Sequence, residues 1–156
     1  MKTILSPYLI FGLIVTMCCS FQCKKDNGIL NINLYGNDTT IIKRYINGKW
    51  KLEYDFGGLI ANQRTDYHDK NIFWEFDNSK IPETVKQTYL GVLQTDTFVI
   101  WNNYTSPPGT NNFYIMEFVN KSQFHNMYTV IGIYNDSLHL LPYIDDASTY
   151  VFSRLK

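Results

Sequence analysis

Three histidines, His68, His125 and His139, are the side chains of this sequence with the chemistry for metal binding or proton transfer. They lie on three separate segments, so only the fold could bring two of them together with Asp66 or Asp69 as zinc ligands. Dispersed histidines more often lie in turns or on the surface, and we expect that here. The sequence also lacks G-x-S-x-G, H-E-x-x-H, Walker and G-x-G-x-x-G motifs. We therefore predict no catalytic residue, no metal, no cofactor and no enzymatic activity.

Asp145 and Asp146 form an acidic pair that suggests a second kind of metal site, because adjacent carboxylates can coordinate calcium. The pair follows Pro142 and precedes Ala147. This setting is typical of a solvated turn, and we predict a turn without calcium.

The cysteines of the chain, Cys18, Cys19 and Cys23, all lie directly behind an apolar run at 8–17. The run is too short to cross a membrane, which takes roughly 20 apolar residues, and it is typical of a secretion signal. Charge directly after a cysteine, here Cys23 in the sequence CKKD, resembles the signal of bacterial lipoproteins, in a form common in Bacteroidota. The resemblance implies that residues 1–22 are a signal peptide and that Cys23 is acylated. Cys18 and Cys19 are alternative sites, and a plain cleaved signal is the other interpretation.

A lipoprotein signal implies an exported protein of the cell envelope, held by a lipid anchor in the outer membrane, with the membrane as its partner. The face and leaflet of that membrane stay open. With Cys23 acylated as the first residue, no free thiol is left for a disulfide. The exported domain would then depend on its core alone for stability.

The charge and composition exclude several classes of protein. The 156 residues include 14 basic and 14 acidic side chains, so the formal net charge is zero. Nucleic-acid binding needs a concentrated positive field, and we exclude nucleic acid as a partner. Hydrophobic residues make up 45% of the sequence and aromatic residues 16%, which excludes a disordered polar chain.

The chain divides into a polar segment and a patterned domain. Residues 23–45 are polar and irregular, and we predict that they form a tether, with a short strand at 29–34. Residues 46–156 form the domain, in which no window of eleven or more residues shows helical periodicity.

Period-two alternation dominates the domain. Trp50, Leu52, Tyr54 and Phe56 alternate with charged residues, which predicts that they share one face of a strand. Further strands are predicted at 71–76, 85–92, 97–102, 113–119, 127–134, 138–141 and 149–155. Short strands joined by short turns indicate an all-β fold, and closure into an eight-stranded antiparallel up-and-down barrel removes exposed edges.

Several short motifs of the domain resemble the lipocalin family, in particular its small bacterial lipoprotein members. They are G-K-W at 48–50, W-E-F-D at 74–77, N-D-S-L at 135–138 and Y-V-F-S-R at 150–154. The resemblance implies that Arg154 packs across Trp50 and closes one end of the barrel. An indole covered by a guanidinium supports that structural role on physical grounds, through burial and a cation–π contact.

Aromatic residues occur on every predicted strand, so many must face the barrel interior. We expect a ligand site lined by Tyr54, Phe76, Tyr89, Trp101, Tyr114 and Tyr128. The first hypothesis is a non-enzymatic, lipid-anchored, lipocalin-like protein that binds a small apolar or aromatic ligand. The alternative is a surface protein-interaction module whose barrel is filled by side chains and which docks a partner through loops such as 104–112. An interior pocket of about 300 Å³ or more separates the two.

The segments 113–119 and 127–134 are apolar on both faces. A strand of this kind needs cover on its outer side as well as on its inner side. Either residues 29–45 cover the outer face or a partner docks there.

Overall fold

The computed structural model describes residues 28–58, 63–102, 113–120 and 126–156. The expected signal peptide and all three cysteines lie outside these residues. The strands are β1 (Ile32–Asn33), β2 (Gly48–Gly57), β3 (Arg64–Asp66), β4 (Phe73–Asp77), β5 (Thr84–Tyr89), β6 (Val92–Asn102), β7 (Tyr114–Phe118), β8 (Met127–Tyr134), β9 (Ser137–Pro142) and β10 (Ser148–Arg154). The helix α2 covers Thr39–Ile46, and a short 3-10 helix covers His68–Lys70. Among the described residues, no helix has the length and apolar character to cross a membrane.

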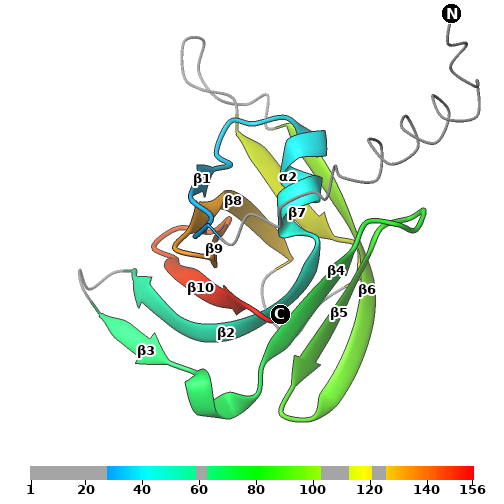
Figure 1. Cartoon of the computed structure of the whole chain (residues 1–156). Helices are drawn as coiled ribbons and strands as arrows, with labels where there is room; N and C mark the ends of the chain where they lie inside the picture. Colours follow the sequence, from blue (N-terminus) through cyan, green and yellow to red (C-terminus); the bar gives the residue numbers. More distant parts are fainter. Residues whose placement is uncertain (1–27, 59–62, 103–112, 121–125) are drawn as a thin grey trace, which may run out of the picture.

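Eight strands close into an antiparallel barrel (Figure 1), in the order β2-β4-β5-β6-β7-β8-β9-β10, with β10 pairing back to β2. Neighbours in the barrel are neighbours in the sequence, so the expected up-and-down barrel is confirmed. Two short strands lie outside this ring: β3 pairs with the second half of β2, and β1 pairs with the end of β8.

The largest difference in strand boundaries lies between β5 and β6. The segment 85–92, expected as one strand, is a hairpin, and the strand expected at 97–102 is the second half of β6. Leu90 and Gly91 form its turn, with φ of 48° and 84°. Two consecutive positive φ values are the geometry of a two-residue hairpin turn. Leu90 was expected to continue the strand because it is apolar, yet it is largely exposed.

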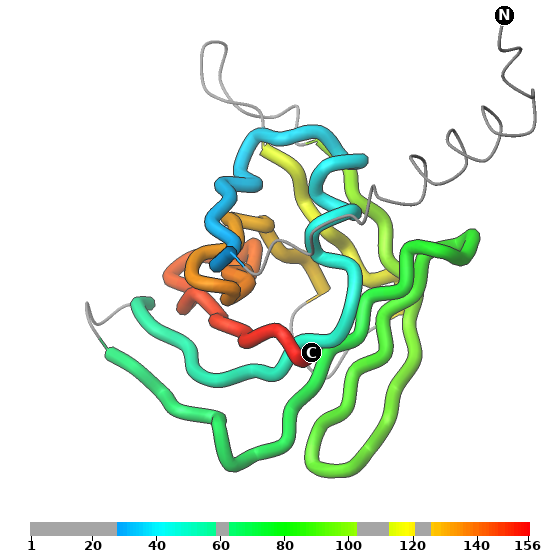
Figure 2. The backbone as a smooth tube through the Cα atoms, in the orientation of Figure 1, coloured from blue at the N-terminus to red at the C-terminus, as the bar shows by residue number. Residues whose placement is uncertain are grey.

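The structure also corrects the predicted tether at 23–45, because the described part of this segment packs on the barrel. The strand β1 pairs with β8, and Leu34 is fully buried in the core. Figure 2 shows the segment before α2 lying beside the chain of β8 and β9. Gly132 permits this approach, since a Cβ there would lie 2.7 Å from the carbonyl oxygen of Ile32. The domain therefore begins near Leu30 rather than at residue 46.

The helix α2 was not expected because its eight residues are shorter than the window that reveals helical periodicity. Its N-cap is Asp38, whose side chain accepts a hydrogen bond of 2.9 Å from the backbone nitrogen of Ile41. Ile42 and Ile46 lie one turn apart and are both buried in the barrel core. The helix therefore covers one end of the barrel, called the α2 end here.

Charged and polar contacts hold α2 against the turn between β4 and β5. Lys43 forms an ion pair with Glu83, and its backbone carbonyl oxygen accepts a hydrogen bond from the side-chain Nδ2 of Asn78. The hydrogen bond from the Lys43 ammonium lowers the pKa of the Glu83 carboxyl. These contacts fix the α2 end on one side.

Trp50 and Arg154 fix the α2 end on the other side. The Trp50 indole is fully buried, and its Nε1 donates to the carbonyl oxygen of Ile46 at 2.6 Å. The Arg154 guanidinium carbon lies 4.6 Å from the centroid of the Trp50 ring, and its Nη2 donates to the carbonyl oxygen of Tyr45 at 2.6 Å. The contact between Trp50 and Arg154 expected from the sequence is therefore present.

Replacing Arg154 with alanine is expected to lower the free energy of unfolding by about 1–2 kcal/mol, through loss of the cation–π contact and the hydrogen bond to Tyr45. Urea denaturation measures the change. Arg64→Ala is the matched control, because Arg64 also stacks on an aromatic ring, but that ring belongs to Tyr54, which is only partly buried, whereas Trp50 is fully buried. We expect a smaller loss there, and equal losses would contradict the role given to Arg154.

The core of the barrel is built around Trp74 on β4. Its ring contacts those of Phe76, Phe118, Tyr128 and Phe152, with centroid distances between 4.9 and 6.2 Å. Three of these pairs meet edge to face and the fourth is tilted, as aromatic rings prefer. Side chains therefore fill the barrel at this level.

Candidate functional site

A bulge in β2 determines which side chains of this strand face the barrel interior after Leu52. Leu52 pairs with Phe152 and Tyr54 pairs with Val151, so Glu53 is an extra residue in β2. Directly paired residues share a face. Asp55 pairs with Tyr150, which packs against the core, and Asp55 therefore faces the interior.

The bulge overturns the expectation that Tyr54 lines the interior. Tyr54 faces outward, where the guanidinium carbon of Arg64 lies 3.7 Å from its ring centroid and Phe56 is its ring neighbour at 6.2 Å. The prediction for Tyr54 was wrong because it assumed that side chains alternate regularly between the two faces of β2 through Glu53.

Trp101 was also wrongly expected to line the interior. It is 37% exposed, and its Nε1 donates to Glu117 on the outside of β7 at 2.9 Å. On β6 the core residue Phe98 faces inward, and Trp101 lies three positions later. Because side chains alternate along a strand, Trp101 faces outward.

The other four expected lining residues face inward, in two different settings. Phe76 and Tyr128 belong to the packed core around Trp74. Tyr89 and Tyr114 are half-buried and pack against the edge of that core. Tyr114 pairs with Asn102, at the opposite end of β6 from Val92, which pairs with Tyr89. Tyr89 has polar neighbours that sequence reasoning missed.

Those neighbours form the tyrosine–aspartate cluster, which consists of Asp55, Tyr67, Tyr89 and Tyr150. The Tyr67 hydroxyl donates to Oδ2 of Asp55 at 3.0 Å. Burial and then this hydrogen bond raise the pKa of Tyr67 well above its ordinary value, and Tyr89 and Tyr150 contribute to the same rise. Burial and then the Asp55 charge raise the pKa of Tyr150. Tyr67 and Tyr150 therefore stay neutral hydrogen-bond donors beside an acidic group.

The cluster lies at the end of the barrel away from α2, called the far end here. Asp55 lies further along β2 than Trp50, which contacts α2. Tyr89 ends β5, while the Glu83 side chain just before this strand contacts α2. Tyr150 lies near the start of β10, and the end of β10 reaches the α2 end through Arg154.

Gln87 lies deeper in the barrel than the cluster. It is two residues before Tyr89 on β5, so both side chains share the inward face. Gln87 is only 4% exposed, and its Nε2 has no hydrogen-bond partner among the described residues. A buried amide donor usually has a hydrogen-bond partner. An acceptor on a bound ligand could supply the partner for this one.

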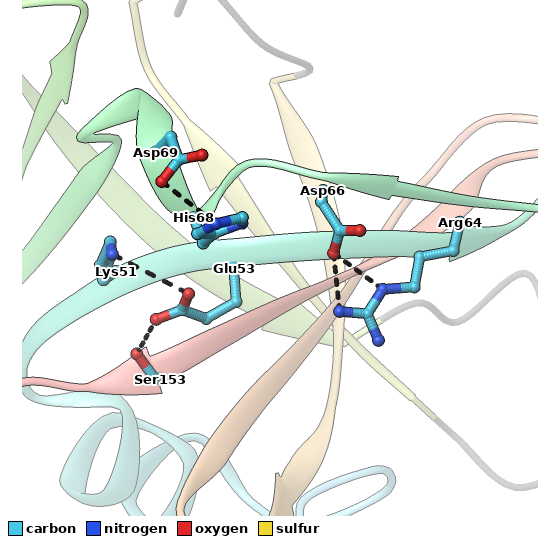
Figure 3. Close-up of polar contacts among 7 residues, drawn as sticks. All are labelled: Lys51, Glu53, Arg64, Asp66, His68, Asp69 and Ser153. Carbon is cyan, nitrogen blue, oxygen red and sulfur yellow. Dashed lines mark hydrogen bonds and ion pairs between the residues drawn. The ribbon is translucent and has the colours of Figure 1, made fainter.

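Outside the barrel, charged residues form local pairs (Figure 3). Ser153 donates to Oε1 of Glu53 at 2.5 Å, and Lys51 lies 3.9 Å from Oε2 of the same carboxylate. Arg64 donates from two nitrogens to Oδ1 of Asp66, at 2.8 and 2.6 Å. The first of these groups is partly buried and the second is exposed, and solvent-accessible pairs of this kind contribute little to stability. They account for the charges on this face without a ligand.

The histidines do not come together as a metal site in the part of the chain that the structure describes. His68 pairs with the adjacent Asp69 at 3.1 Å, and both are exposed (Figure 3). His139 lies on the outer face of β9, beside the rings of Phe56 and Tyr134. No group of three or more metal-ligating side chains occurs among the described residues, and His125 lies outside them.

The environment of His139 predicts an acid-sensitive stability. Burial lowers the pKa of His139 below 6.5, so the unfolded chain binds more protons than the folded chain as the pH falls below that value. The urea midpoint is expected to fall between about pH 7 and pH 5, and His139→Gln should reduce that fall. His68→Gln, at an exposed position, should keep the wild-type slope. The same slope in His139→Gln would contradict the assignment.

An outer groove of about 390 Å³ lies over β8 and β9. Its lining residues are Tyr35, Phe113, Thr129, Leu141, Pro142, Tyr143, Ile144 and Asp145. Tyr35 and Phe113 stack with ring centroids 5.7 Å apart, and the segment that carries Tyr35 covers part of the outer face of β8. The groove keeps open the second expectation for this face, namely a docking surface, whereas the loop 104–112 expected to dock a partner lies outside the described residues.

Comparison with known proteins adds no identification. No protein-family model, no curated protein and no solved structure was found to match this chain. The geometry of the barrel therefore carries the functional inference.

Proposed function

We propose that this chain is a non-enzymatic lipoprotein of the cell envelope, with a lipocalin-like barrel that binds a small molecule at its far end. The observation that carries the proposal is the inward orientation of Asp55 between Tyr67 and Tyr150. Asp55 is half-buried, so its carboxylate loses part of its hydration, and the Tyr67 hydroxyl is one donor that replaces some of it. Polar groups that the fold itself does not require are typical of binding sites.

The packing of the barrel restricts the site to the far end. Trp74 and its aromatic neighbours occupy the middle, and Trp50 with α2 occupies the other end. A guest would lie above Trp74, in contact with the tyrosine–aspartate cluster and Gln87. This arrangement supports a small guest rather than a long acyl chain.

The lipid anchor is supported by the position of Cys23 behind the apolar run at 8–17. The structure shortens the tether, because Leu30 exchanges backbone and side-chain hydrogen bonds with Asp136 at 2.9 and 3.2 Å. From Cys23 to Leu30 an extended chain reaches at most about 25 Å. An acylated Cys23 would therefore hold the barrel close to the membrane surface.

The alternative function, a protein-interaction module, is favoured by one observation, the outer groove. Tyr143 and Ile144 at its rim are 44% and 53% exposed. Exposed apolar side chains beside a groove suit a protein partner. The two functions differ in the binding site: the small molecule would bind at the far end of the barrel, and the protein partner would bind at the outer groove.

Native mass spectrometry of the protein purified from its own envelope in mild detergent tests the proposal. We expect the acylated chain to carry a small guest that dissociates on activation. Thr65→Trp should remove the guest, because Thr65 pairs with Asp55 and is itself exposed. Thr95→Trp, at an exposed position on the outer face of β6, should keep it. A wild-type barrel without a guest, or equal guest content in both variants, would contradict the proposal.

A further inference from the structure

We infer that the guest carries a cationic amine and that Asp55 is its counter-ion inside the barrel. The inference rests on the proposed function and names the chemical class of the ligand. It follows from the charge of Asp55, from the rings around it and from the Gln87 Nε2, which lacks a partner among the residues described.

Asp55 lacks a cationic partner among the described residues. The ion pairs of the described lysines, arginines and histidines all go to other carboxylates. Asp55 receives one hydrogen bond there, from Tyr67 to Oδ2, and its Oδ1 receives none. An inward carboxylate is stabilised when a cation pairs with it. A ligand ammonium is the group that would complete this pairing.

Asp96 shows how this protein stabilises a carboxylate that has only a structural role. It is 2% exposed and accepts hydrogen bonds from the backbone nitrogens of Thr97 and Asn120 and from Nδ2 of Asn120, at 2.7, 3.0 and 2.8 Å. Three donors from its own chain thus surround Asp96. Asp55 has one such donor in the described part of the chain, and the contrast indicates that its remaining oxygen is available to a ligand.

The tyrosines of the cluster favour a cation over a neutral guest. Tyr67 directly follows β3, Tyr89 ends β5 and Tyr150 lies on β10, and all three are half-buried against the core. Aromatic rings attract ammonium groups, most strongly where water is partly excluded. The hydroxyl of Tyr67 also holds the Asp55 carboxylate in place.

Gln87 supplies a second point of recognition. Its Nε2, which has no partner within the ranges that the structure describes, is a hydrogen-bond donor at a deeper level of the same interior. A molecule that places an ammonium at Asp55 and an oxygen acceptor at Gln87 would satisfy both groups. Small aromatic amines with a ring hydroxyl carry both of these groups, and tyramine is a suitable probe.

Isothermal titration of the full chain in detergent with tyramine and with 4-ethylphenol tests the inference. The two probes share the phenol ring, and only tyramine carries the ammonium. We expect the wild-type protein to bind tyramine at least tenfold more tightly than 4-ethylphenol, and Asp55→Asn to remove that preference. Asp66→Asn is the matched control, because Asp66 lies on the paired strand β3 but faces outward toward Arg64. It should keep the preference.

Tyr67→Phe keeps the test decisive if Asp55→Asn loses its thermal unfolding transition. This variant removes the hydroxyl that binds Asp55 but keeps the charge, so it should keep the preference for tyramine.

Equal binding of both probes to the wild-type protein, or a preference that survives in a folded Asp55→Asn protein, would overturn the amine inference while the proposed function stands. Failure of both probes to bind, together with a wild-type barrel that carries no guest, would overturn both.

Discussion

Replacing Trp74 with alanine is expected to lower the free energy of unfolding by about 3–5 kcal/mol, the largest loss for any single side chain in the core. The Trp74 ring is 1% exposed and contacts four aromatic rings from β4, β7, β8 and β10. Removing it leaves a cavity that these strands cannot fill without changing the barrel. Chemical denaturation followed by far-ultraviolet circular dichroism measures the loss.

Trp101→Ala is the matched control for Trp74→Ala. Both substitutions remove an indole, but Trp101 lies on the outer face of β6 and is 37% exposed. Its replacement is expected to cost about 1 kcal/mol or less. Similar losses in the two variants would contradict the central position given to Trp74.

Cys23→Ser is expected to release the protein from the membrane fraction completely. Acyl chains bind membranes with about 0.8 kcal/mol per buried methylene, so loss of the acylated thiol removes the whole anchor. Fractionation of cells that express the full chain, with intact-mass analysis of the mature protein, measures both the location and the acyl mass.

The two other cysteines supply the controls for this prediction. Cys18→Ser and Cys19→Ser should leave the mature protein acylated and in the membrane fraction. Release by Cys18→Ser instead would move the anchor to that residue. An unmodified N-terminus in the wild-type protein would contradict the lipid anchor itself.

The sequence predicted the barrel well because its strands follow local rules. Period-two alternation and turn residues mark β4, β7, β8, β9 and β10, and a meander of such strands has few ways to close. The pairing of Trp50 and Arg154 could also be predicted, because it depends on the first and last strands of the barrel meeting.

The candidate site could not be predicted, because it depends on a single irregularity. The extra residue Glu53 in β2 turns Tyr54 outward and Asp55 inward, and it is set by pairing with β10, nearly a hundred residues away in the sequence. Regular alternation assigned these two side chains to the wrong faces. Tyr67 and Gln87 were missed for a related reason, since their roles depend on neighbours that only the closed barrel provides.

The helix α2 and the turn between β5 and β6 could not be predicted, because each is too short to produce a recognisable sequence pattern. The helix has two turns, and its two buried isoleucines give too short a period to distinguish from chance. The hairpin turns at Leu90, an apolar residue with positive φ, where the usual turn residues are absent before Gly91.

One measurement tests the central claim, that a small molecule binds inside the far end of the barrel. A nitrogen-15 spectrum of the full chain in detergent reports the side-chain amide of Gln87 directly, and titration with tyramine shows which signals move. We expect the Gln87 side-chain amide and the backbone amide of Tyr150 to shift together and to saturate at one affinity. Shifts confined to Leu141, Tyr143 and Ile144 in the outer groove, with Gln87 unchanged, would contradict the claim.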